Sequence, residues 1–69
     1  MRVLVVGVGY WGPIIVRNLV EFPLVEAIGV SYIDQERAKA IASRFPRTHV
    51  ARQAPEAFAD GYDVAIIVT

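Results

Sequence analysis

Three glycines between an apolar run and a proline constrain this chain more than any other feature. The segment that starts at residue 2 reads RVLVVGVGYWGP and places its glycines at Gly7, Gly9 and Gly12. Because each glycine costs a folded chain entropy, three within six residues indicate a backbone that requires them. Residues 2–6 are rich in Val, as in a strand buried on both faces of a parallel sheet, and Pro13 suits the first turn of a helix.

The rest of the chain alternates between apolar runs and amphipathic segments. A helix is predicted after Pro13, because Ile15, Val16, Leu19 and Val20 fall on one face at helical spacing. Asp34 predicts an N-cap for a second helix over residues 35–45, which Pro46 ends. Its apolar face is predicted to carry Ala38, Ile41, Ala42 and Phe45. Apolar and β-branched residues predict strands at 24–31, 48–52 and 63–69, with a short helix at 55–60.

This order of elements predicts an α/β fold. Strands that alternate with helices form parallel sheets with right-handed crossovers. We therefore expect a Rossmann-like parallel sheet with helices on both faces. A chain of 69 residues buries only about 60% of its unfolded surface, so we expect residues 1–69 to be part of a larger dinucleotide-binding domain, apparently truncated after the fourth strand, with a substrate domain absent.

Charge and composition argue against several classes of partner. Seven basic and seven acidic residues balance, and the basic ones are scattered, which disfavours nucleic acid and anionic membranes. The chain has no cysteine, hence no disulfide or thiolate metal site, which is compatible with a cytoplasmic enzyme. The one histidine, His49, has no second ligand or nucleophile nearby in the sequence, so we expect neither a metal site nor a catalytic acid or base.

The three glycines fit the G-x-G-x-x-G pattern of dinucleotide-binding loops, standing between a first strand and a first helix. A pyrophosphate is bound there by backbone N–H groups at the positive end of the helix. In this pattern Gly7 permits the turn, Gly9 removes a side chain that would keep phosphates away, and Gly12 lets helix and strand approach. A plain glycine-rich turn is the alternative.

The end of the second strand decides which dinucleotide is expected. NAD-binding proteins usually place an acid about twenty residues beyond the last glycine, to bind the adenine ribose. Here Ser31 and Tyr32 offer hydroxyls instead, and Asp34 is the nearest carboxylate, either as a helix cap or as a ribose ligand. Without that acid, a 2′-phosphate meets less repulsion and Arg37 can reach it, so both NAD and NADP stay open as cofactors.

With these residues in view, the sequence resembles the N-terminal domain of the Gfo/Idh/MocA oxidoreductases. The matching segments are VGVGYWGPIIVRNL at 6–19, IDQERAKAIASRF at 33–45 and DVAIIVT at 63–69. GYWGP followed by RN is similar to members that act on sugars or nucleotide sugars. The resemblance covers the whole chain but only about the first half of that family's cofactor domain.

The resemblance implies a cofactor site and a reaction. It implies that Gly7, Gly9, Tyr10, Trp11 and Gly12 surround the pyrophosphate, that Thr69 borders the crevice beside the first strand, and that the complete enzyme transfers hydride between a nicotinamide and a hydroxyl-bearing, sugar-like substrate. Tyr32 departs from the family, which usually has Asp there, and the family's Glu-Lys-Pro motif would lie beyond Thr69. Tyr10 and Trp11 either shield the phosphates or pack beneath the sheet edge.

Two other readings stay open. The chain could be a non-catalytic, nucleotide-binding or structural half-domain that associates with another chain through its last apolar strand, since unpaired strand edges favour association. A homo-oligomer is one form of that association. A flavin on the same loop is a further alternative, because the glycines do not distinguish NAD from FAD.

Overall fold

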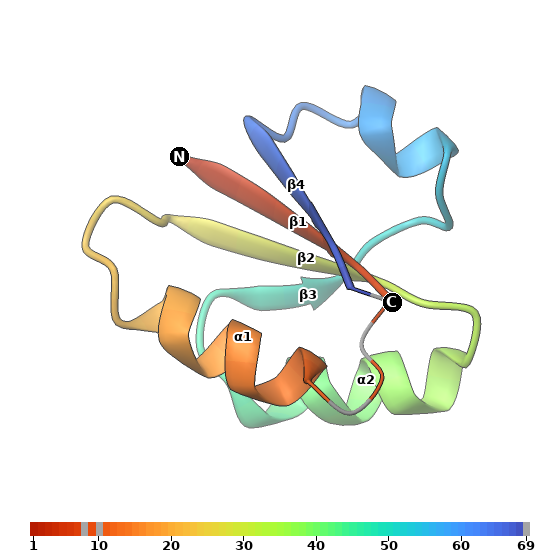
Figure 1. The fold of residues 1–69 in the computed structure, drawn as a ribbon, viewed down its shortest axis with the longest axis horizontal. Coiled ribbons are helices and arrows are strands. Elements are labelled where there is room, and N and C mark those ends of the chain that lie inside the picture. The colour runs from red at the N-terminus through yellow and green to blue at the C-terminus, as the bar shows by residue number, and fades with distance from the viewer. Residues whose placement is uncertain (8, 10, 69) are drawn as a thin grey trace.

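The computed structural model describes residues 1–7, 9 and 11–68 (Figure 1). Strands and helices alternate along them in the order that the sequence predicts. The elements are β1 (Arg2–Val6), α1 (Gly12–Val20), β2 (Ala27–Ser31), α2 (Gln35–Arg44), β3 (Thr48–Val50), the 3₁₀ helix η1 (Glu56–Ala59) and β4 (Val64–Ile67).

The strands form one parallel sheet in the order β3-β2-β1-β4. Val5 lies at its centre, paired with Val30 on one side and with Ile66 on the other. The chain steps from β1 to β2 to β3 in one direction and then crosses back to β4, so the strand order reverses between β1 and β4. This confirms the predicted α/β class. Ligands of open parallel sheets bind outside the carboxyl ends of the strands at such a reversal.

Helices α1 and α2 both lie on one face of the sheet (Figure 1). An aliphatic core fills the space between the two layers. Val16 of α1 and Ala38 and Ile41 of α2 pack there against alternate strand residues. The buried members of this core are Val3, Val5, Val16, Val25, Ile28, Val30, Ala38 and Ile41. The helical periodicity in the sequence predicted these helix faces.

The other face of the sheet carries η1 and a smaller core (Figure 1). Leu4, Ala51 and Ala57 are buried there, with Val6 and Tyr62 packed against them. Helical elements therefore cover both faces, although the second face has only the single 3₁₀ turn of Glu56–Ala59. None of the helices in the described part of the chain is long and apolar enough to cross a membrane.

Several element boundaries differ from the sequence prediction, most of all those of β2 and β4. The second strand begins at Ala27 rather than residue 24, because the amino group of Met1 donates to the Leu24 carbonyl at 2.6 Å and that loop closes beneath β1. Leu24 is consequently exposed. The last strand, Val64–Ile67, is shorter than the predicted 63–69. The cap at Asp34 is confirmed, since its carboxylate accepts the Arg37 backbone N–H at 3.2 Å.

Candidate functional site

The turn out of β1 requires glycine at its first position. Gly7 has φ +78°, which side-chain-bearing residues rarely adopt, and its N–H donates to the Ser31 carbonyl at 2.7 Å. A Cβ on Gly7 would collide with the carbonyl oxygen of Val68, directly after β4. The loop therefore begins where three strand ends converge, those of β1, β2 and β4.

Beyond Gly7 the loop faces open space. A Cβ placed on Gly9 would meet no described atom within 4 Å. The helix that follows begins at Gly12, which is buried, and has Pro13 in its first turn as predicted. No described side chain caps this amino end, whereas Asp34 caps α2. The positive end of α1 therefore lies at the glycine loop.

Trp11 is 58% exposed. This exposure is inconsistent with the interpretation that Trp11 packs beneath the sheet edge. The other interpretation, shielding of bound phosphates, stays a prediction. Tyr10 and Thr69, which the resemblance also places at the site, lie outside the described residues.

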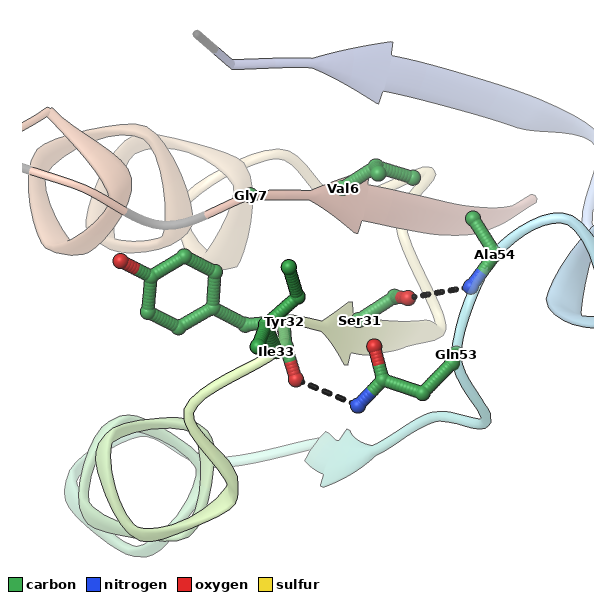
Figure 2. Close-up of a pocket in the computed structure, with 7 residues that line it drawn as sticks. All are labelled: Val6, Gly7, Ser31, Tyr32, Ile33, Gln53 and Ala54. Atoms are coloured by element: carbon green, nitrogen blue, oxygen red, sulfur yellow. Dashed lines mark hydrogen bonds between the residues drawn. The ribbon is translucent and has the colours of Figure 1, made fainter.

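The carboxyl end of β2 is fastened to the segment after β3. The Ala54 N–H donates to Ser31 Oγ at 3.1 Å, and Gln53 Nε2 donates to the Tyr32 carbonyl at 2.6 Å (Figure 2). Ser31 is only 2% exposed, so its hydroxyl is a buried part of this junction. The Tyr32 ring points away from Gln53 and Ala54 and packs against the aliphatic core on the helix side (Figure 2).

A cavity of about 290 Å³ opens at these strand ends (Figure 2). It is bordered by the end of β1, the end of β2 and the segment after β3, and its lining is mostly apolar. The lining residues are Val6, Gly7, Ser31, Tyr32, Ile33, Gln53 and Ala54. Ile33 is 87% exposed at its rim, so it offers an apolar surface to a flat ligand. The volume is at the lower end of the range typical of small-molecule sites.

Arg37 connects α2 with the glycine loop. It lies in the first turn of α2, and its Nη2 donates to the Gly9 carbonyl at 3.2 Å. Among the described residues no carboxylate forms an ion pair with this guanidinium. Its positive charge lies at the glycine loop, and no carboxylate of the described residues neutralises it there.

Three of the predicted site residues, Gly7, Ser31 and Tyr32, line this cavity. Gly9 and Asp34 do not line it, and each is hydrogen-bonded to Arg37. Sequence reasoning missed Ile33, Gln53 and Ala54. The signal was available, since residues after the third strand of a parallel sheet reach the same edge as those after the second.

Two other features of the surface lie apart from this edge. A larger hollow of about 440 Å³ lies beside the end of α1 and is lined by Asn18, Glu21 and Phe22. His49 Nε2 lies 2.7 Å from the Tyr62 hydroxyl, in a hydrogen bond on the η1 face. Within residues 1–7, 9 and 11–68, no group of three potential ligands could hold a metal ion.

Comparisons of this chain with protein-family models, with curated proteins and with solved structures each returned no match. The resemblance to the Gfo/Idh/MocA oxidoreductases accordingly stays a prediction from the sequence.

Proposed function

We propose that this chain binds a nicotinamide dinucleotide, NAD or NADP, as the cofactor-binding part of an oxidoreductase. One observation carries the proposal: a helix amino end that no described side chain caps follows a loop that is open at Gly9 and turns sharply at Gly7. Free backbone N–H groups and the helix dipole suit a pyrophosphate, which carries negative charge but needs no side-chain ligand. The adjoining cavity is of a kind that suits the adenine half of the same molecule.

In this proposal, different residues bind different parts of the coenzyme. The amides of the loop and of the first turn of α1 bind the pyrophosphate, while the apolar lining at Val6 and Ile33 contacts the adenine. Arg37, which bonds to the loop from the first turn of α2, is assigned to the ribose that joins these two parts of the ligand. The nicotinamide half would extend past the ends of β1 and β4, where the strand order reverses.

In the complete enzyme the nicotinamide would accept or donate hydride at a carbon bearing a hydroxyl, on a sugar or nucleotide-sugar type of substrate. The substrate class rests on the GYWGP resemblance alone. The described residues at this site bind and orient, and none of them is assigned a catalytic acid or base role.

Titration with reduced coenzyme tests the proposal. We expect the purified protein to bind NADH or NADPH, measured by nicotinamide fluorescence and calorimetry. Gly9→Val should weaken that binding at least about tenfold, or about 1.4 kcal/mol, because its side chain would occupy the space that the phosphates need. Unfolding curves should remain close to those of the unmodified protein, since that space is open in the structure.

A matched control is Ala40→Val, which places the same side chain at an exposed position of α2 and should leave coenzyme binding unchanged. Failure of the unmodified protein to bind either coenzyme, or equal binding by Gly9→Val, would contradict the proposal. A flavin spectrum in the purified protein would instead support the flavin reading of the same loop.

A second candidate function is a non-catalytic module that pairs through β4. This strand is an edge of the sheet, and Val64 and Ile67 are 42% and 58% exposed on it. An apolar hollow of about 240 Å³ lies beside it, with Phe22 and Leu24 among its lining residues. Such an edge favours association. Concentration-dependent sedimentation without coenzyme binding would favour this function over the first.

A further inference from the structure

The hydrogen-bond acceptors at the carboxyl end of β2 are already used by the protein. The Ser31 carbonyl accepts from the Gly7 N–H, and the Ser31 hydroxyl oxygen accepts from the Ala54 N–H. The Tyr32 carbonyl accepts twice, from Gln35 Nε2 at 2.9 Å and from Gln53 Nε2 at 2.6 Å. A carboxylate at this strand end would accept from a ribose 2′-hydroxyl, whereas the Ser31 and Tyr32 oxygens named above already accept from protein donors.

Hydrogen-bond donors at the same place are in surplus. The Arg37 guanidinium has five N–H groups, and among the described residues it is bonded only to the Gly9 carbonyl. That carbonyl is neutral, so it leaves the positive charge uncompensated. A phosphate accepts hydrogen bonds without donating them when fully ionised, and it pairs well with the forked geometry of arginine.

The position of Arg37 matches the ribose rather than the other parts of an adenine dinucleotide. In such a ligand the ribose lies between the pyrophosphate and the adenine. Arg37 reaches the glycine loop, which serves the pyrophosphate in the proposed function, from the first turn of α2. That turn begins two residues after Ile33, which with Tyr32 lines the cavity proposed for the adenine.

The nearby negative charges do not cancel this preference. The Asp34 carboxylate caps α2, where the positive end of the helix and the Arg37 backbone N–H offset its charge. Glu36 pairs with Lys39 at 3.8 Å on the exposed side of α2. Among the described residues, Arg37 is the charged side chain that extends from this turn to the loop.

Resting on the proposed function, we infer that the coenzyme is the 2′-phosphorylated dinucleotide, NADP, and that Arg37 binds its 2′-phosphate. Tyr32 contributes by leaving the end of β2 without a carboxylate. Arg37 is therefore a specificity-determining residue. The preference for NADP comes from the Arg37 N–H groups, which can donate to a phosphate, and from the Ser31 and Tyr32 oxygens, which already accept hydrogen bonds within the protein.

Parallel titrations of the intact purified protein with NADPH and NADH test this inference. We expect NADPH to bind at least tenfold more tightly. In competition experiments, 2′,5′-ADP should displace bound NADPH at concentrations at least tenfold lower than 5′-AMP, since only the former carries the additional phosphate.

Two variants locate the preference. Arg37→Gln should weaken NADPH binding at least tenfold and change NADH binding less than twofold, and Tyr32→Asp should favour NADH by adding an acceptor and a repulsive charge. Arg44→Gln, which removes the same charge from the exposed last turn of α2, is the matched control and should change neither. Urea unfolding of each variant shows that altered binding does not come from loss of the fold.

The possible failures are distinguishable. Equal or tighter binding of NADH overturns this inference and leaves the proposed function standing. Arg37→Gln that remains folded and keeps the NADPH preference overturns the role of Arg37. Binding of neither coenzyme by the unmodified protein overturns the proposed function and, with it, this inference.

Discussion

The two faces of the sheet are built by different means. On the face covered by α1 and α2, aliphatic side chains such as Val16, Ile28 and Ile41 form one continuous buried core. On the η1 face the buried hydrophobic cluster is small, and a polar assembly around Tyr62 extends it. The Arg2 guanidinium lies 5.0 Å from the centre of the Tyr62 ring, and His49 stacks on that ring at a centroid distance of 6.0 Å.

This difference teaches how stability and specificity are distributed. Aliphatic packing gains from buried area and tolerates exchange between similar residues, whereas hydrogen bonds and ring contacts depend on particular partners. Ile28 and Gly29 are neighbours in β2 and face opposite sides of the sheet. They allow the two kinds of construction to be compared at one point of the chain.

The largest expected effect is at Ile28, which is fully buried under the helices. Ile28→Ala should lower the free energy of unfolding by about 3 kcal/mol, because it removes buried methyl groups and leaves a cavity. Since a chain of this size holds only about 5 kcal/mol in total, Ile28→Val, with an expected loss of about 1 kcal/mol, provides the graded comparison. Urea unfolding followed by circular dichroism measures both. Equal losses for the two variants would contradict close packing on this face.

The contrast between the faces also explains what the sequence could predict. Periodicity placed Val16, Ala38 and Ile41 in the core, because a helix repeats its buried face regardless of its precise partner. Asp34 was predicted as a cap because the cap and its N–H are three residues apart. Such local rules predicted the helices, the parallel sheet and the position of the glycine loop.

These local rules do not predict contacts between segments that are distant in the sequence. The sequence AIGVS gives no reason for a glycine at position 29. The reason is the ring of Tyr62, which lies in the connection that leads to β4. For Gln53 the strand order indicates the edge of the sheet that it reaches, but its bond to the Tyr32 carbonyl depends on the path of the chain after β3. The sequence thus predicted the part of the site that the glycine loop forms and missed the part that the segment after β3 forms.

A smaller effect is expected at Gly29. A Cβ there would collide with the Tyr62 hydroxyl, so Gly29→Ala should displace the ring and break its hydrogen bond with His49. We expect a loss of about 1–2 kcal/mol in the free energy of unfolding, as for other overpacked sites. The ring and its partner belong to the η1 face, so the helix-side core should be unchanged.

The double variant Gly29→Ala/Tyr62→Ala sharpens this test. With the ring removed, the added methyl group has space, and alanine costs less backbone entropy than glycine, so Gly29→Ala should be neutral or stabilising in that background. A thermodynamic cycle from urea unfolding of the four proteins measures the coupling. A loss that persists without the ring would place its cause in the strand itself.

The smallest effect is expected at the exposed ion pair that closes the η1 face. Arg52 donates from Nε and Nη2 to the two carboxylate oxygens of Asp60 at 2.8 and 2.7 Å. The hydrogen bond from Arg52 lowers the pKa of Asp60 below its ordinary value, outweighing the opposing effect of burial. A carboxyl with a lowered folded-state pKa stabilises the fold above its unfolded-state pKa, and that contribution disappears as pH falls through the folded-state value.

Arg52→Gln should therefore be slightly less stable than the unmodified protein at neutral pH, with the difference vanishing in acid once Asp60 is protonated in the folded state. Added salt should also shrink the difference, because the pair is exposed and its attraction is screened. Urea unfolding at about pH 7 and about pH 2 measures it, with Arg44→Gln as a control of equal charge change but no described carboxylate partner. A difference that persists in acid would mean that Arg52 acts through its bond to the Glu56 carbonyl at 3.1 Å, so that the η1 face is held there by a contact to backbone rather than by charge.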